Sequence, residues 1–233
     1  MKQAVLVLVF SLAFQVGARA QLFAKERVLN DEHFDKKRTS WGFFLGLNSY
    51  DFKFEYEQPD QEILVTESTG FNVGLLGNLR LNDYFDLRLE PGLYFTRRDL
   101  LFPGDFATEE AATREVSSNY IHVPLLLKFS TKRLNNFKPF VVGGMSFSTN
   151  LSSNEENPDD NSAGQFRMTS LTYYYELGIG IDLYLPYFKF TPSLRGVFAL
   201  SDELVRDKDP NSPYTSNITS MQSRGIFINF TFQ

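Results

Sequence analysis

Apolar and polar side chains alternate along most of the chain after residue 40. A period of two places successive side chains on opposite faces of a β-strand. No stretch of helical periodicity competes with this pattern, which predicts strands at residues 41–57, 70–81, 85–97, 118–130, 137–148, 172–185, 188–198 and 222–232. The fold is therefore expected to be all-β, with eight strands.

The predicted strand at residues 85–97 shows the alternation plainly. Phe85, Leu87 and Leu89 share one face, and Asp86 and Arg88 share the other. One face of the strand is thus suited to hydrocarbon, and the opposite face is polar and charged.

The first predicted strand departs from this regularity. Its apolar residues have one parity from Trp41 to Leu47 and the other parity from Tyr50 to Tyr56. An extra residue in a strand reverses the direction of the side chains that follow, so this change predicts a β-bulge near Asn48 and Ser49.

The lengths of the connections between strands alternate as well. The links after the second, fourth and sixth strands are short, and those after the first, third, fifth and seventh are long. In an up-and-down antiparallel meander, links of one parity lie at one end, so short turns and long loops are separated. Transmembrane β-barrels have this asymmetry, with short periplasmic turns and long outer loops.

A soluble eight-stranded barrel, such as a lipocalin, is the alternative fold, because parity does not show which face points inward. Three features favour the membrane. The strands are long enough to cross a bilayer while tilted, and the polar face carries mid-strand charges unlike a lipocalin interior. Aromatic residues also gather near strand ends, as membrane girdles require: Trp41, Tyr84, Phe85, Phe95, Tyr120, Phe137, Phe147, Tyr173, Tyr184, Tyr187 and Phe188.

The polar face of the predicted barrel contains the candidate site residues. An eight-stranded barrel is only wide enough for its own side chains, so general porin activity is disfavoured and buried charges are expected to neutralise one another. A narrow proton or ion path through part of this set is the functional alternative. The predicted interior charge network comprises Arg80, Arg88, Glu90, His122, Lys128, Glu176, Asp182 and Arg195.

The first residues read as an export signal. Lys2, a short apolar run and a small-residue end at Ala18–Ala20 are typical of a secretory signal peptide. We expect a signal peptide at 1–20, a flexible periplasmic leader at 21–40 and a barrel at 41–233 in the cell outer membrane. The chain has no Cys, so neither a disulfide framework nor a thiolate metal site is expected.

Composition narrows the function further. The net charge of −5 does not indicate the basic surface that binding to nucleic acid requires. His122 is the only histidine after His33, and its same-face neighbours along the strand are Tyr120 and Pro124, so no catalytic Ser is indicated. We expect no enzyme activity, no cofactor and no small-molecule substrate. The long loops are acidic and expected to be solvated and mobile. Calcium binding through the carboxylates of the third loop is an alternative, although Asp159–Gly164 does not match the spaced ligands of a calcium loop.

Three segments of the chain carry a family resemblance: WGFFLGLNSYDF from Trp41, GFNVGLLGNLRLNDYFDLRLEPGLYF from Gly70, and YIHVPLLLKFSTKRLNNFKPFVVGG from Tyr120. They resemble the PorT/SprT-type outer-membrane proteins of the Bacteroidetes type IX secretion system. The resemblance implies a non-enzymatic component of protein export, linked to gliding where gliding occurs, with outer-membrane lipid and other secretion-machinery proteins as partners. A general small barrel for envelope integrity or adhesion, or a lipid-modifying enzyme that uses His122, are the alternatives.

Overall fold

A computed structural model describes residues 29–58, 60–158, 161 and 164–233. The expected signal peptide and the first part of the expected leader, residues 21–28, lie outside the described residues. In the described part of the chain no helix is long and apolar enough to cross a membrane. The strands are β1 (Thr39–Tyr56), β2 (Leu64–Glu67), β3 (Thr69–Arg80), β4 (Phe85–Leu89), β5 (Gly92–Leu101), β6 (Thr113–Ser130), β7 (Phe137–Asn150), β8 (Leu171–Tyr184), β9 (Lys189–Ala199) and β10 (Ile218–Phe232).

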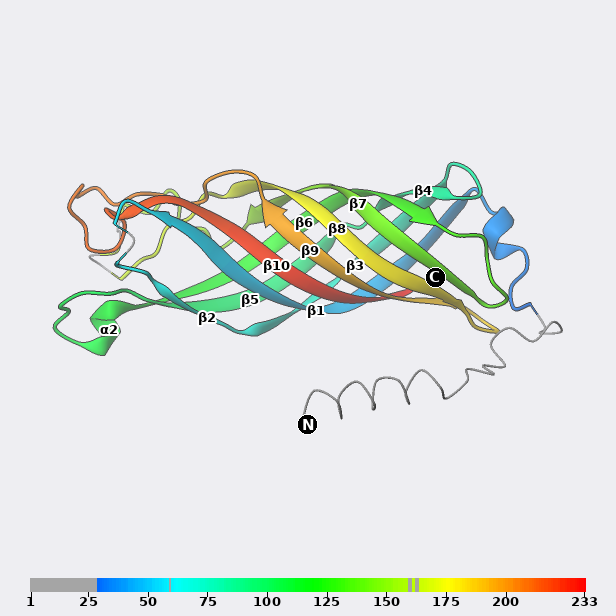
Figure 1. The fold of residues 1–233 in the computed structure, drawn as a ribbon, viewed down its shortest axis with the longest axis horizontal. Coiled ribbons are helices and arrows are strands. Elements are labelled where there is room, and N and C mark those ends of the chain that lie inside the picture. The colour runs from blue at the N-terminus through cyan, green and yellow to red at the C-terminus, as the bar shows by residue number, and fades with distance from the viewer. Residues whose placement is uncertain (1–28, 59, 159–160, 162–163) are drawn as a thin grey trace, which may run out of the picture.

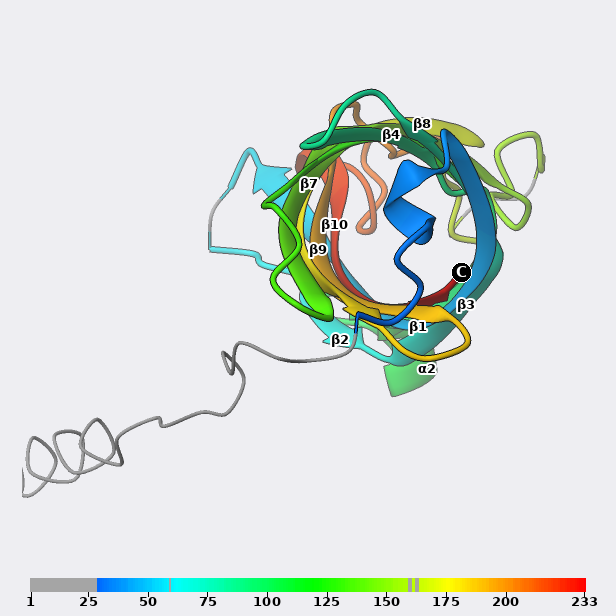
Figure 2. The same cartoon turned by 90° about the vertical axis from the view of Figure 1, so that its right-hand side faces the viewer.

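The strands form a closed antiparallel ring. From β6 to β10 each strand pairs with the next one, and β1 pairs with both β10 and β3. The strands β2 and β3 together form one wall of the ring, and β4 and β5 form the next, so the ring has eight walls. Figures 1 and 2 show the closed ring from the side and along its axis. The predicted eight-stranded up-and-down barrel is confirmed.

The division between β4 and β5 lies at Glu90 and Pro91. Proline has no backbone N–H and cannot donate to a ladder, which interrupts the strand there. The wall nevertheless continues, because the Leu75 N–H donates to the Pro91 carbonyl at 2.9 Å and the Glu90 N–H donates to the Pro124 carbonyl at 3.2 Å.

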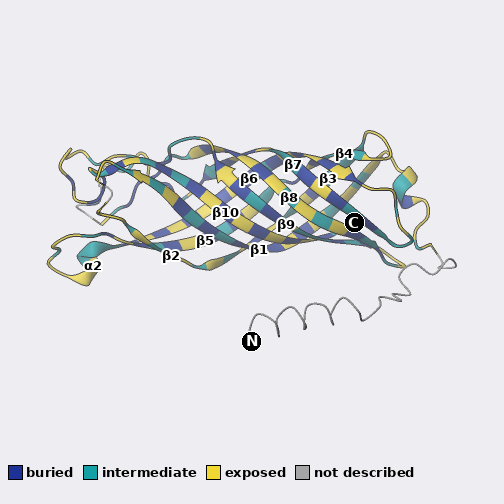
Figure 3. Cartoon of the chain, viewed as in Figure 1, coloured by how far each residue is buried: buried dark blue, intermediate teal, exposed yellow. Residues whose placement is uncertain are grey.

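Burial follows the alternation of the sequence (Figure 3). On β6, Tyr120, His122 and Lys128 are buried inside the ring. Leu125 and Leu127, which point outward from the same strand, are 51% and 44% exposed. An outward apolar band over a polar interior is the reverse of a soluble barrel and matches a wall that contacts lipid.

The bulge predicted near Asn48 and Ser49 is wrong. The pairing of β1 with β10 continues through both residues without a shift, and the register changes only between Glu55 and Tyr56. Tyr50 and Phe52 are buried on the interior face. The apolar parity changes because the interior itself becomes aromatic and apolar toward the long-loop end, so the strand has no need to turn over.

Two residues of the predicted aromatic girdles also point inward. Tyr120 and Tyr184 are each 2% exposed and belong to the interior. Trp41, at 74% exposure, and Tyr187, at 94%, do lie on the outer surface near the short-turn end. Tyr120 and Tyr184 point inward because they have the inward parity of their strands. An aromatic residue near a strand end can face either side of the wall.

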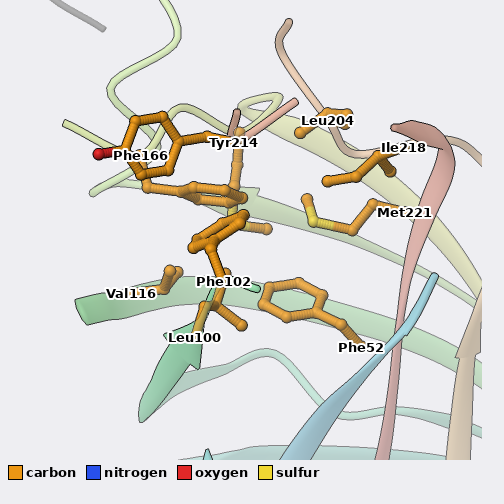
Figure 4. Packing of buried hydrophobic residues seen from close by; sticks show 10 residues of the cluster. Phe52, Leu100, Phe102, Val116, Phe166, Leu204, Tyr214, Ile218 and Met221 are labelled. Carbon is orange, nitrogen blue, oxygen red and sulfur yellow. The ribbon is translucent and has the colours of Figure 1, made fainter. Parts of the chain in front are cut away.

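The described parts of the long loops form a packed cap over one end of the barrel. Phe102, Phe166 and Tyr214 from three loops contact Phe52 and Met221 of the strands in one buried apolar cluster (Figure 4). The loop between β5 and β6 adds the short helix α2 (Glu109–Ala112). These loops are therefore folded against the barrel, which differs from the solvated segments that their charge predicts.

The opposite end of the ring is covered by the described part of the leader. The 3-10 helix η2 (Phe34–Lys36) lies within the outline of the ring at the short-turn end (Figure 2). Phe34 is 9% exposed, and the Tyr184 hydroxyl donates to Asp35 at 2.7 Å. This part of the predicted flexible leader is thus docked on the barrel.

Candidate functional site in the barrel interior

Seven of the eight predicted network residues lie in the barrel interior. They come from four walls of the ring: β4 with the following Glu90, β6, β8 and β9. Their side chains point inward because each residue has the inward parity of its strand. None is more than 4% exposed: Arg88, Glu90, His122, Lys128, Glu176, Asp182 and Arg195. The structure therefore gathers residues that are more than 100 positions apart in the sequence, such as Arg88 and Arg195.

Arg80 does not join them. Its parity is correct, but it is the last residue of β3 and lies at the rim, with 27% of its side chain exposed. There it forms an ion pair with Asp83 and donates to the Asn82 carbonyl at 3.2 Å. These contacts hold the short turn. The prediction that Arg80 belongs to the interior network is therefore wrong.

The first group of interior charges lies toward the short-turn end. Lys128 Nζ and Asp182 Oδ2 are 2.5 Å apart, and Lys189 Nζ approaches the same oxygen at 3.9 Å. The Thr191 hydroxyl donates to the other carboxylate oxygen at 2.8 Å. Asp182 therefore compensates two lysines. Lys189, the first residue of β9, belongs to this group although the predicted network does not include it.

The second group lies deeper in the barrel and forms a chain of alternating charge. Arg88 contacts Glu90 at 2.7 Å, and Glu90 contacts Arg195 at 2.9 Å. Arg195 then approaches Glu176 at 3.3 Å. Each carboxylate thus lies near at least one guanidinium, as a charge buried in a low-dielectric interior requires.

His122 connects Glu176 to a serine that sequence reasoning missed. The His122 Nε2 and Glu176 Oε1 atoms are 2.8 Å apart, and His122 Nδ1 is hydrogen-bonded to the Ser148 hydroxyl. The contact arises because His122 pairs with Ser148 across β6 and β7. Only the strand register could have identified Ser148, since its distance along the chain carries no signal.

Around these two groups, buried cations and carboxylates are equal in number. Four cations, Arg88, Lys128, Lys189 and Arg195, lie among four buried carboxylates, Asp86, Glu90, Glu176 and Asp182. Removing one partner from such a set leaves an uncompensated buried charge, which costs about 3–5 kcal/mol. The arrangement therefore favours a rigid, mutually neutralised filling over a site that exchanges ions.

An aromatic layer covers the charges on the side of the long loops. Rings from β1, β5, β6, β8 and β10 form one buried cluster: Phe44, Tyr50, Tyr94, Tyr120, Tyr174 and Phe227. The Tyr94 ring lies 5.0 Å from that of Phe227 and 4.9 Å from the imidazole of His122, measured between centroids. Charges, rings and loop cap thus follow one another along the barrel axis.

The Ser148, His122 and Glu176 side chains are the residue types of a nucleophile, a base and an orienting acid. A hydrolase needs space for a substrate carbonyl beside the serine oxygen. Here the three residues are 1%, 0% and 1% exposed and lie under the aromatic layer. This packing favours a structural role for the constellation.

Several solved outer-membrane proteins are similar to this chain. OprG from Pseudomonas aeruginosa is 14% identical, with a TM-score of 0.47 over 83% of this chain and 93% of that protein. Ail of Yersinia pestis, in complex with the heparin analogue sucrose octasulfate, is 12% identical, with a TM-score of 0.40 over 84% and 99%. Neisserial surface protein A is 11% identical, with a TM-score of 0.40 over 84% and 98%.

A match to a family model covers most of the chain. No curated protein sequence matches this chain. Residues 19–205 match the family described as outer membrane protein beta-barrel domain. With the closed ring and its outward apolar band, this match places the protein in the outer membrane. The chain belongs to the outer membrane protein beta-barrel domain family.

Proposed function

We propose that this barrel is a non-enzymatic scaffold that supports type IX protein secretion by binding partner proteins at its two ends. One observation carries the proposal: neutralised charges, aromatic rings and a loop cap fill the barrel interior from end to end. A barrel filled in this way offers a transported protein no passage. The surfaces left for function are its ends and its wall.

The link to type IX secretion comes from the resemblance of three segments to PorT/SprT-type proteins. These segments cover most of β1, then β3, β4 and the start of β5, and finally the second part of β6 with the first part of β7. They include the short turns at residues 81–84 and 131–136, which face the periplasm in a barrel of this topology. Secretion partners in the periplasm would meet this end first.

A general role in envelope integrity or surface adhesion is the second candidate. The folded cap supports it, because a preformed outer surface binds a ligand at a lower entropic cost than mobile loops do. Glu109 and Glu110 are exposed on α2 at this end. A lipid-modifying role that uses His122 has less support, because His122 is 0% exposed.

Deletion of the gene in the parent bacterium tests the proposal. Secreted proteins with a C-terminal sorting domain should be lost from the medium and return when the wild-type gene is restored. If a gene carrying His122→Gln also restores secretion of these proteins, that result would support a non-catalytic role for the His122 side chain. Normal export in the deletion strain would refute the secretion role, and altered surface binding in that strain would favour the second candidate.

A further inference from the structure

The chain fills the short-turn mouth of its own barrel with a short peptide that includes Phe34 and Asp35. Both side chains of this pair point into the mouth, where each has its own seat. A three-residue 3-10 helix has little stability alone, because helix nucleation is unfavourable. The mouth therefore holds the segment in place, and the contacts show what chemistry the mouth accepts.

The first seat receives a carboxylate. The Tyr184 hydroxyl donates to Asp35 Oδ1 at 2.7 Å. Arg133 Nη1 and Lys138 Nζ lie 3.8 and 3.9 Å from Asp35 oxygens. The Arg133 guanidinium also lies over the Tyr184 ring, 3.7 Å from its centroid, which fixes both groups. Two cations and a hydroxyl from three different parts of the barrel thus converge on one anion.

The second seat receives an aromatic ring. Lys189 Nζ lies 4.2 Å from the centroid of the Phe34 ring, within the range of a cation–π interaction. The Tyr184 ring meets Phe34 edge to face, with centroids 6.1 Å apart. The two seats share Tyr184, so they select a ring and a carboxylate that are neighbours in one peptide.

Backbone contacts complete the docking without adding a strand. The Asn30 N–H donates to Asn136 Oδ1 at 2.9 Å, and the Asn30 side-chain amide donates to the Tyr184 carbonyl at 2.9 Å. Arg133 Nη1 donates to the Asp31 carbonyl at 3.2 Å. These few bonds can be exchanged for equivalent bonds from another peptide, because no sheet ladder has to be broken.

We propose that the short-turn mouth is a recognition site for a partner protein's peptide that carries an aromatic side chain next to a carboxylate. The Phe34–Asp35 segment occupies this site in cis until such a peptide displaces it. This inference rests on the proposed scaffold role, and it names the site and the chemistry of the partner. The carboxylate can belong to an acidic side chain or to a chain terminus.

The test uses the full-length mature chain in lipid nanodiscs. Phe34→Ala combined with Asp35→Asn vacates the mouth, and a fluorescent, amide-capped peptide with the sequence of residues 29–38 is then added. We expect saturable binding to this variant and at least roughly tenfold weaker binding to the wild type, whose own segment competes intramolecularly. A peptide with Asn at the position of Asp35 should bind roughly tenfold more weakly, as loss of a charge-assisted contact predicts.

Two further changes separate recognition from adhesion to the barrel. Arg133→Gln with Lys138→Gln in the vacated background should abolish binding. The matched change Lys132→Gln, at an exposed lysine of the same turn, should not. Heat-modifiable migration on gels shows whether each barrel is folded. A peptide ending in a free Phe carboxylate, compared with its amidated form, shows which source of carboxylate the mouth prefers.

The proposal is overturned if the folded, vacated barrel fails to bind the peptide, or if loss of Arg133 and Lys138 leaves binding unchanged. Cross-linking that placed the segment in the mouth of a second copy would also overturn the cis arrangement. Failure of the proposed function is seen elsewhere, as normal export in the deletion strain. Lost export without peptide binding would reject only the mouth site.

Discussion

Lys128 and Asp182 meet inside the barrel at 2.5 Å although their strands are not neighbours. Lys128 lies on β6 and Asp182 on β8, with β7 between them. Backbone hydrogen bonds connect β6 to β8 only through β7, whereas this ion pair connects the two strands directly. Such bridges connect the interior face of the ring independently of the sheet ladder.

Asp182→Asn should destabilise the barrel more than Lys128→Met. The first change leaves Lys128 and Lys189 as two buried cations, at a cost of about 3–5 kcal/mol. The second leaves Asp182 beside Lys189, so its cost should be smaller. Urea unfolding of protein refolded into lipid vesicles measures both. Asp83→Asn, whose side chain is 72% exposed, serves as the control and should change stability by less than about 1 kcal/mol. Equal losses for Asp182→Asn and Lys128→Met would contradict the shared-partner arrangement.

The loop cap should loosen as pH rises. Burial raises the pKa of Glu203, in the loop between β9 and β10, from 4.5 to about 7. The nearby Arg98 lowers this pKa and Asp202 raises it, and the Ser223 N–H and hydroxyl each donate to the carboxyl at 2.9 Å. Between these two pKa values the folded cap binds a proton that the opened cap releases, so its stability falls as pH increases.

Raising the pKa of Glu203 from 4.5 to about 7 corresponds to roughly 3 kcal/mol between the low-pH and high-pH limits. Hydrogen-exchange protection factors for residues 200–217, measured at pH 5 and pH 8, report this opening. Glu203→Gln should give a cap whose protection hardly changes with pH. Protection that increases with pH in the wild type would contradict the assigned direction.

The outward face of the barrel was largely predictable from the sequence, and the interior contacts were not. Alternation places Leu87 and Arg88 on opposite faces, and the strand lengths, the mid-strand charges and the aromatic residues near strand ends indicate that the face of Leu87 meets lipid. Alternation does not fix which inward residues meet. The contact of His122 with Ser148 depends on the register of β6 and β7, and that register follows from the stagger of the closed barrel.

Other differences arise where one local rule gives way to the overall shape. Tyr50 and Phe52 suggest a bulge only if the whole barrel interior is assumed to be polar. The part of the interior toward the long loops is in fact lined by buried aromatic and apolar clusters. Arg80 has the inward parity but lies at the rim, where water competes for it. The loop cap leaves no periodic signal, because Phe102, Phe166 and Tyr214 lie in separate irregular segments.

The single tryptophan gives a test of how the barrel sits in the bilayer. Trp41 is 74% exposed on the outer wall near the short-turn end. Its fluorescence should be quenched more by lipids brominated near the headgroup than by lipids brominated near the chain ends. In a Trp41→Phe, Leu45→Trp variant the preference should shift toward the deeper bromines. The same depth for both positions would contradict the tilt and orientation of β1.

The account depends most on which face of each strand meets lipid. A carbene-generating lipid probe, activated within the bilayer and followed by peptide mapping, tests this in the unmodified protein. Labels should appear on Leu87, Leu127 and Ile179, and not on the adjacent interior residues of the same strands. Labelling of Arg88 or Glu176 that spared Leu87 and Ile179 would contradict the arrangement.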